Sequence, residues 1–482
     1  MRGPGPGPSL GRVTAHLTPV DATFLELEQR DEGAHMHIGG VMVFEERPSG
    51  GTPPLAEVRR QLEDRLGSLP RYRQRLSSPR TGGVRWPTWE ADANFDIKAH
   101  VRRARLPGNG DDADLLEWAS EFFSQRLDRT RPLWEAVVID GLSDGRWALV
   151  TKTHHCMVDG VGSVDVATLM LDAEPAPATD RHAVEPAAYH EERGLFGNLA
   201  RIPERLAGAA VKTLLLNAGT SAPADRARDL LDRSKALAEV VVRDEVIAAP
   251  ASSINVPIGG RRRLGVASVP LDEVKAIKRR MGGTVNDVVL AAAAGGLRRL
   301  LLERGESPPE GGLRAMVPVN VRKAGEHLAL GNRITSLFVR LPVDEADPED
   351  RYTRQMEEAE WLKSGSQALG ATTLLDLTGL APPLVHSFLA RSLFATRLFN
   401  VTITNVPGPQ QPLYAFGSRL TAVWPLVPLA ADHTLGIAVF SYDGTLFFTV
   451  NADYDAVPDL DVLIGGIKDA ISELSPAAAA AG

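Results

Sequence analysis

The spacing of apolar residues in the first third of the chain predicts both strands and helices. Short apolar runs predict strands at 39–44, 134–139 and 147–153. A helical repeat of apolar positions covers residues 55–69. Helices and strands alternate here, which is typical of a mixed α/β domain.

The last 230 residues show the same mixture of elements. Apolar runs predict strands at 264–269, 316–321 and 336–341. Near the end, residues 435–442 and 445–452 flank Asp443 and Gly444, a dipeptide favoured in two-residue hairpin turns. The two halves therefore resemble each other in element types, and we expect two related domains of α/β (α+β) class.

The chain is too long for one core, and its composition indicates where it divides. Its 482 residues exceed the roughly 250 to 300 residues at which a single hydrophobic core stops growing. Residues 174–186 are rich in Pro, Ala and charge, a composition typical of a linker. We therefore predict four segments: a flexible tail 1–15, a first domain 16–173, a linker with amphipathic helices 174–250, and a second domain 251–482.

Within the linker, residues 195–214 carry apolar side chains at close to helical spacing, with basic residues on other faces. The basic residues are Arg201, Arg205 and Lys212. Two interpretations remain open. The segment is either a helix packed on its own protein or a helix that lies on a membrane surface.

Composition and charge exclude several classes of protein. With 44% hydrophobic residues the chain can bury a core, which excludes whole-chain disorder. Its net charge of −8, from 53 basic and 61 acidic residues, lacks the positive field with which nucleic-acid binders attract phosphate. A single cysteine, Cys156, and no export segment favour a reducing cytoplasm. No apolar run is long enough to span a bilayer, so any membrane contact is expected to be peripheral.

The candidate chemistry is concentrated directly after the predicted strand at 147–153. His154 and His155 are followed by Asp159 and Gly160. Histidine can accept a proton near neutral pH, and neighbouring residues on a strand point to opposite faces, so only one of the two can be the base. Asp159 can orient an imidazole or fix the following turn, and Gly160 allows a backbone conformation that other residues resist.

Two other interpretations of the histidine pair remain open from the residues alone. A metal site is disfavoured, because adjacent ligands diverge and no second cysteine or histidine cluster completes a tetrahedral set. A buried, purely structural histidine pair also fits the pattern. Motifs elsewhere in the chain distinguish between these interpretations.

The pattern His-His-x-x-x-Asp-Gly resembles that of acyltransferases related to chloramphenicol acetyltransferase and of peptide-synthetase condensation domains. Further blocks follow in order: Pro19, Asp21 and Phe24; Pro132, Leu133 and Trp134; Asn286 and Asp287; and the run from Thr404 to Pro409. Together they resemble the bacterial wax ester synthase/diacylglycerol acyltransferase family over nearly the whole chain. Thr404 stands where that family more often has Ser, and the hydroxyl is retained.

The resemblance implies two chloramphenicol acetyltransferase-like domains with an active-site channel between them. It implies an acyl-CoA:diacylglycerol or long-chain-alcohol O-acyltransferase, active in triacylglycerol or wax ester synthesis, with acyl-CoA as substrate and no cofactor. It assigns His155 as the general base that activates the acceptor hydroxyl for direct attack on the thioester, without an acyl-enzyme. His154 and Asp159 complete the catalytic motif, and the acceptor's low solubility implies a cytoplasmic protein bound peripherally to the inner membrane face or to lipid droplets.

Residues outside the histidine motif carry weaker predictions. Asn286, at the start of a predicted helix, is suitably placed to bind an oxyanion or a CoA carbonyl, together with Gly160. Thr284 and Asp287 also form the pattern of a capping box, which predicts a structural role for Asp287. Thr404 and Asn405 are expected to line the channel or to bond the following turn. By comparison with condensation domains, Arg73 is expected to be a structural partner of Asp159.

Two further functions remain as alternatives. One is a condensation-type acyltransferase that takes its acyl group from a carrier protein. The other is a catalytically silent lipid-binding protein of the same fold. The intact His155 and Asp159 argue against the second alternative.

Overall fold

A computed structural model of the chain describes residues 15–17, 19–67, 69–77, 87–157, 168–175, 248–320, 334–364 and 398–475. In the first part of the chain the elements are β1 (Ala15–His16), α1 (Pro19–Arg30), β2 (His37–Phe44), α2 (Leu55–Leu66), β3 (Gln74–Leu76), β4 (Thr88–Ala91), α3 (Ile97–His100), β5 (Val101–Arg105), α4 (Asp112–Ser124), β6 (Trp134–Asp140) and β7 (Trp147–His154). In the second part they are β8 (Arg262–Pro270), α7 (Leu271–Met281), α8 (Val285–Glu303), β9 (Leu313–Asn320), β10 (Ile334–Leu341), α9 (Pro348–Ser364), β11 (Val401–Pro407), β12 (Tyr414–Ala415), β13 (Ser418–Leu426), β14 (Leu435–Tyr442), β15 (Thr445–Asp453) and α12 (Leu460–Glu473).

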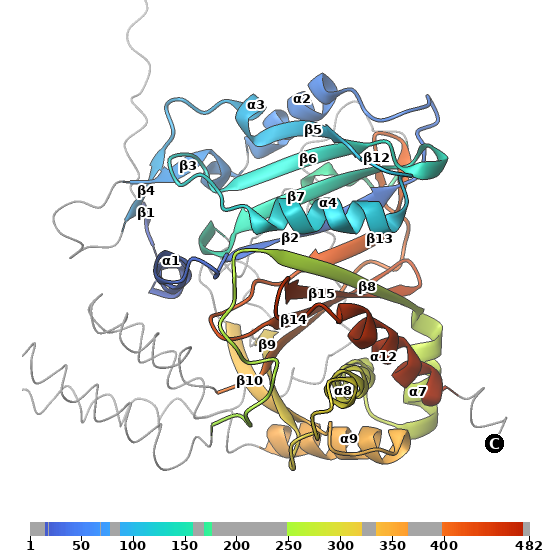
Figure 1. Cartoon of the computed structure of the whole chain (residues 1–482). Coiled ribbons are helices and arrows are strands. Elements are labelled where there is room, and N and C mark those ends of the chain that lie inside the picture. The colour runs from blue at the N-terminus through green and yellow to red at the C-terminus, as the bar shows by residue number, and fades with distance from the viewer. Residues whose placement is uncertain are drawn as a thin grey trace, which may run out of the picture.

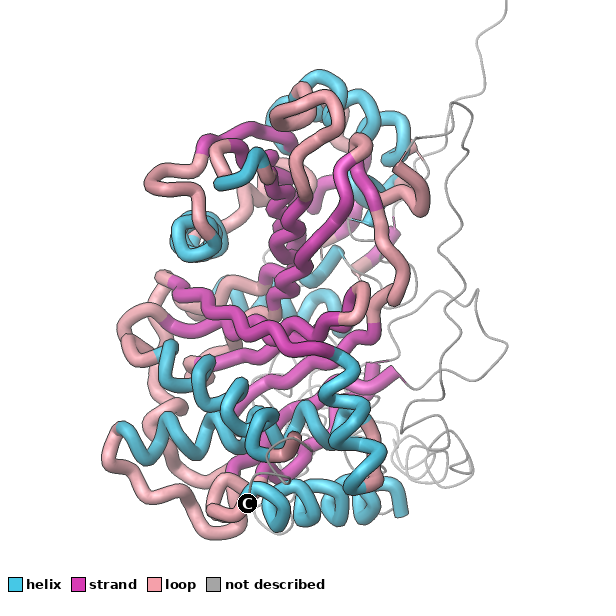
Figure 2. The backbone as a smooth tube through the Cα atoms, turned by 90° about the vertical axis from the view of Figure 1, so that its right-hand side faces the viewer, coloured by secondary structure: helices cyan, strands magenta, loops and turns pink. Residues whose placement is uncertain are grey.

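The described elements form two six-stranded sheets that lie one above the other (Figure 1). The first has the strand order β12-β13-β2-β7-β6-β5 and the second β10-β9-β11-β14-β15-β8. The helices α7, α8, α9 and α12 gather on the side of the second sheet that is farther from the first (Figure 2). A small sheet of order β1-β4-β3 lies at one end of the first domain.

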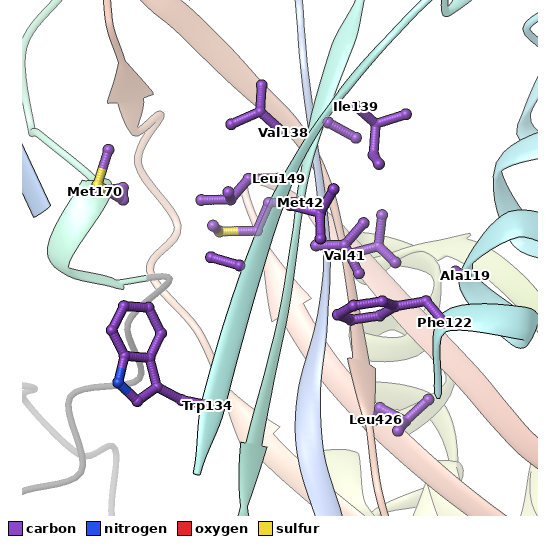
Figure 3. Close-up of a cluster of buried hydrophobic side chains, with 14 of the residues drawn as sticks. Val41, Met42, Ala119, Phe122, Trp134, Val138, Ile139, Leu149, Met170 and Leu426 are labelled. Atoms are coloured by element: carbon purple, nitrogen blue, oxygen red, sulfur yellow. The ribbon is translucent and has the colours of Figure 1, made fainter. Parts of the chain in front are cut away.

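Inner strands of the two large sheets, such as β7 and β15, are buried along almost their whole length, as their continuous apolar runs predict. In the first domain the strands separate two groups of core side chains (Figure 3). Trp134 and Met170 lie on one side, and Ala119 and Phe122 of α4 lie on the other. In the second domain α8 is the central helix, buried along most of its length among apolar neighbours.

One segment of the second half belongs to the first sheet. Residues 418–426 form β13, which pairs antiparallel with β2, and β12 pairs with β13 at the sheet edge. The predicted division at 251–482 assigns this segment to the second domain, because its sequence gives no sign of a partner some 380 positions earlier. The first sheet therefore depends on strands from both halves of the chain.

The domains are also joined where α4 meets the edge of β8. The hydroxyl of Ser124 accepts a hydrogen bond from the backbone N–H of Arg262 (2.8 Å), and that of Ser120 accepts one from Leu264 (3.0 Å). These hydroxyls satisfy backbone donors that an edge strand otherwise leaves open. The Arg262 side chain, 2% exposed, donates to Gly33 O in the first domain and to Gly259 O at 2.7 Å.

Most local predictions are confirmed by the described elements. The predicted hairpin is present as β14 and β15, and Asp443 and Gly444 have φ values of 42° and 80°, the left-handed pair that a type I′ turn requires. The helix predicted at 55–69 ends earlier, at Leu66. Most of the predicted linker and the predicted helix at 195–214 lie outside the described residues. No helix within the described ranges is long and apolar enough to cross a membrane.

Candidate active site

The two histidines lie where the central strand β7 ends and a short 3₁₀ helix begins. His154 is the last residue of β7, and His155 starts the 3₁₀ helix His155–Met157. The backbone N–H of His155 donates to Met36 O at 2.8 Å, which ties the turn to the start of β2. A strand end inside a six-stranded sheet is a rigid mount for a reactive side chain.

His154 is fully buried and both of its ring nitrogens are occupied. Its Nδ1 accepts a hydrogen bond from the backbone N–H of Cys156 at 3.1 Å, and its Nε2 lies 3.2 Å from Glu28 Oε2. Because a neutral imidazole has one donor and one acceptor, Nδ1 as acceptor places the hydrogen on Nε2, which donates to Glu28. His154 therefore has no nitrogen left with which to take a proton from a substrate.

His155 differs from its neighbour in both respects. It is only partly buried, and its Nδ1 has no hydrogen-bond partner among the described residues. Its ring stacks on Phe24 of α1, with centroids 3.9 Å apart and planes at 24°. Burial of the imidazole lowers the pKa of His155 to about 4. At neutral pH the ring is therefore unprotonated, which is the form that a general base requires.

Glu28 is the centre of a buried polar cluster behind the histidines. The carboxylate is 3% exposed, with Oε2 2.5 Å from Arg129 Nη2 and Oε1 3.4 Å from His37 Nε2. Burial alone would raise the pKa of Glu28, but the contacts with His154 and His37 outweigh it and hold the pKa below its ordinary value. Glu28 is therefore an anion that only accepts hydrogen bonds.

Burial lowers the pKa of three other titratable side chains near Glu28. Burial lowers the pKa of His37 to about 3 and that of His35 to about 4. Burial also lowers the pKa of Lys152 to about 8, although its ammonium donates to Phe122 O (2.9 Å) and Gln125 O (2.8 Å). Sequence reasoning did not single out any of these residues, nor Glu28. The only signal was His35-x-His37 ahead of a strand, which places both side chains on one face.

In the second domain the structure brings Asn286 and Asn405 together. Asn405 Nδ2, on β11, donates to Asn286 Oδ1 at 3.3 Å, in the first turn of α8. The expected capping box is present, since Thr284 and Asp287 bond each other's backbone N–H groups. Asn405 faces α8, so Thr404, its neighbour on the strand, points to the opposite face of the sheet. Thr404 and Asn405 therefore cannot contact the same substrate atom from β11.

Other predicted site residues are not joined to the histidines by the described contacts. Asp159 and Gly160 lie outside the described residues, so the predicted pair of Asp159 and Arg73 stays a prediction. The guanidinium of Arg73 lies 3.3 Å from Glu63 Oε1 and 5.0 Å from the ring centroid of Phe95. Among the described residues, no group of three or more His, Cys, Asp or Glu side chains has the arrangement of a metal site.

Trp134 is buried and bonded within the first domain. Its indole N–H donates to Tyr72 O at 2.8 Å, and its ring stacks on His100 with centroids 4.6 Å apart. These contacts agree with the structural role that the sequence favours for the Pro132-Leu133-Trp134 block.

Comparisons with known proteins agree on one family. Residues 17–289 match the wax ester synthase/diacylglycerol acyltransferase catalytic domain, and residues 330–475 match the corresponding C-terminal domain. Two Mycobacterium tuberculosis proteins named as probable diacylglycerol O-acyltransferases are each 34% identical to this chain. One match covers 95% of both chains, and the other covers 96% of this chain and 99% of the relative.

Solved structures extend the comparison to the fold. The wax ester synthase/diacylglycerol acyltransferase from Marinobacter aquaeolei VT8 is 28% identical, with a TM-score of 0.68 over 95% of this chain and 98% of its own. The first condensation domain of the CDA synthetase has a TM-score of 0.55 at 16% identity over 96% of this chain and 97% of its own, which shows a shared fold. The predicted mixed α/β architecture of two related domains is thereby confirmed.

Proposed function

Because the chain belongs to the wax ester synthase/diacylglycerol acyltransferase family, we propose that it transfers a long-chain acyl group from acyl-CoA to diacylglycerol, to a long-chain alcohol or to both, with His155 as general base. The observation that carries the role of His155 is the contrast between the two histidines. His154 is buried with both nitrogens bonded, whereas His155 is neutral and partly exposed, and its buried Nδ1 has no hydrogen-bond partner among the described residues.

The proposed reaction is a single displacement at the thioester. His155 removes the proton from the acceptor hydroxyl as the oxygen attacks the thioester carbonyl. The C–S bond then breaks, and the protonated imidazole returns its proton to the departing CoA thiolate. The products are an ester and CoA, and the histidine regains its neutral form.

Asn286 supports a second part of the proposal. Its Oδ1 is engaged by Asn405, which leaves its Nδ2 group as a donor at the N-terminal turn of α8. A donor at the positive end of a helix stabilises negative charge. We assign this amide, with Gly160 as a further candidate, to the substrate carbonyl or the oxyanion that forms from it; Thr404, on the opposite face of β11, is not part of this assignment.

A competition assay tests the proposed activity. Purified protein is given palmitoyl-CoA with diacylglycerol and a long-chain alcohol together, and both thiol release and the lipid products are measured. Triacylglycerol or wax ester formed in proportion to free thiol supports the proposal. Product that forms only when the acyl group is carried on a carrier protein would favour the condensation-type alternative. No thiol release with any acceptor would favour a silent lipid-binding protein.

The lowered pKa of His155 predicts the pH dependence of the reaction. A histidine with a pKa of about 4 is in its basic form above that pH, so activity should be lost only as the pH falls through about 4. For an ordinary histidine the loss would begin near its usual pKa of 6.5. The measurement is kcat/KM across the acid range, which reports groups of the free enzyme. Recovery on return to neutral pH excludes unfolding as the cause, and a midpoint at or above 6.5 would contradict the assignment.

We further propose peripheral association with a membrane or lipid-droplet surface. The support is chemical, because diacylglycerol and long-chain alcohols partition into interfaces rather than water. The sequence of residues 195–214, which lie outside the described part of the chain, combines apolar periodicity with Arg201, Arg205 and Lys212. Each basic residue near an anionic surface contributes roughly 1 kcal/mol of attraction that salt weakens.

Liposome flotation tests this association. Wild-type protein should float with anionic vesicles at low salt and less at high salt, because the attraction is partly electrostatic. The variant Leu199→Asp plus Leu206→Asp should float poorly while it stays folded. If this variant floats as well as wild type, residues 195–214 are a packing element and contact with the surface is made elsewhere.

A further inference from the structure

One face of α1 contacts both histidines of the motif. Phe24 and Glu28 are four residues apart, and side chains at this spacing lie one above the other on a helix. Phe24 stacks on the ring of His155 at 3.9 Å, and Glu28 accepts the Nε2–H of His154 at 3.2 Å. A single helical turn therefore supports both rings.

We propose that Glu28 is a positioning residue for acyl transfer: it fixes the tautomer of His154, and His154 in turn fixes the backbone that carries His155. The inference rests on the proposed role of His155 as general base. Neither the histidine motif nor the family match assigns this carboxylate a role.

The proposal follows from the two nitrogens of one ring. While Glu28 holds the hydrogen on Nε2 of His154, Nδ1 has a lone pair that accepts the Cys156 backbone N–H at 3.1 Å. If the hydrogen moved to Nδ1, it would point at that N–H and the bond would be lost. Cys156 follows His155 directly, so this bond orients the first turn of the 3₁₀ helix that begins at His155.

Glu28 is itself held rigidly, as a positioning group must be. Arg129 Nη2 lies 2.5 Å from Oε2 of the Glu28 carboxylate. Arg126 donates to the backbone oxygens of Glu28 (3.1 Å) and Asp31 (2.7 Å) at the end of α1. Both arginines lie in the segment directly after α4. This segment therefore helps to set the position of α1 against the histidines.

The test compares two substitutions that differ in one property. Glu28→Leu removes the acceptor, whereas Glu28→Gln keeps an oxygen that can accept the Nε2–H and removes only the charge. Glu32→Gln, at an exposed position just after α1, is the matched control for the change in charge. For each protein we measure kcat, KM for acyl-CoA, the melting temperature, and the tautomer of His154 from the ¹⁵N shifts of labelled histidine.

We expect Glu28→Leu to lower kcat by about 10- to 100-fold, the effect typical of losing a group that orients a functional imidazole. KM should change little, because the residue does not contact substrate. Glu28→Gln should lose no more than about 5-fold, since a neutral acceptor makes a weaker hydrogen bond than a charged one. The ¹⁵N shifts should show the Nε2–H tautomer in wild type and Glu28→Gln, and a mixture in Glu28→Leu.

A second pair of variants keeps the test decisive if Glu28→Leu does not fold. If Glu28→Leu does not fold, the double variant Glu28→Leu plus Arg129→Leu is used instead, because it leaves no buried charge unpaired. The Glu28 substitution that folds is then also made in a His154→Asn background, where the Asn side-chain oxygen accepts the Cys156 N–H without help from Glu28. The loss in kcat should largely disappear in that background, because the two residues act through one bond.

Equal kcat in Glu28→Leu and the Glu32→Gln control, or an undiminished loss in the His154→Asn background, would overturn the proposal. These outcomes are distinct from failure of the proposed function. If His155→Ala keeps full activity, the general-base assignment fails whatever Glu28 does. If His155→Ala is inactive and Glu28→Leu is not impaired, only the positioning role fails.

Discussion

Replacing His155 by Ala should lower kcat by about 10²- to 10⁴-fold, the range that general-base assistance contributes, while the protein keeps a melting temperature close to that of wild type. The ring is partly exposed, and its Nδ1 has no hydrogen-bond partner among the described residues, so the main described contact that the substitution removes is the stack on Phe24. Steady-state kinetics with acyl-CoA, alongside thermal melts, provide the measurement.

His154→Ala is the matched comparison, and it should show the opposite balance. It leaves Glu28 and the Cys156 N–H without the buried imidazole, which costs about 1–3 kcal/mol for each unsatisfied group. We therefore expect the larger loss of stability from His154→Ala and the larger loss of activity from His155→Ala. Equal losses of activity from the two variants, both folded, would contradict a single base at His155.

Arg262→Met should destabilise the protein by about 3–5 kcal/mol, the cost of breaking a buried charged contact from one side. The Arg262 side chain is 2% exposed and lies 4.0 Å from Asp453, which is 3% exposed and would lose its nearest cation. The substitution also leaves the carbonyl of Gly33 without the donor that links the two domains. Urea unfolding gives the change in free energy.

Arg261→Met is the control, because it neighbours Arg262 and its side chain is 62% exposed. Its contact with Asp455 spans 3.8 Å at the surface, where ion pairs contribute about 0–1 kcal/mol. If the two variants unfold at the same urea concentration, Arg262 does not hold the domains together. A loss confined to Arg262→Met shows that the buried guanidinium stabilises the interface, in addition to the hydrogen bonds made by Ser120 and Ser124.

The elements that the sequence predicted correctly are those fixed by neighbouring residues. The turn at Asp443 and Gly444 and the capping box of Thr284 and Asp287 need only a few consecutive positions. The pairing of β13 with β2 was not predictable in the same way, because the paired residues, such as Trp424 and Val41, lie some 380 positions apart in the sequence. Apolar alternation shows that a strand has a partner but does not say which partner.

The site was predictable only where its functional residues are consecutive in the sequence. His154 and His155 are neighbours at the end of a predicted strand, so their side chains point to opposite faces and only one of them can be the base. Glu28 lies about 125 positions earlier, in a helix whose charged residues look like an ordinary solvated face. Its importance follows from burial and from the contact with His154, neither of which periodicity reveals.

The pairing of β13 with β2 also limits where this enzyme can be joined to a relative in a chimaera. A chimaera joined between the two halves of the chain would combine β2 and β7 from one parent with β12 and β13 from the other. The pairs that β13 makes along β2, from Leu420 with Phe44 to Leu426 with Gly39, would then join sequences that did not evolve together. Gly40 packs closely against β13, since a Cβ there would lie 2.5 Å from Trp424 O. A chimaera that keeps the first sheet from a single parent therefore has to move residues 414–426 together with the first half of the chain.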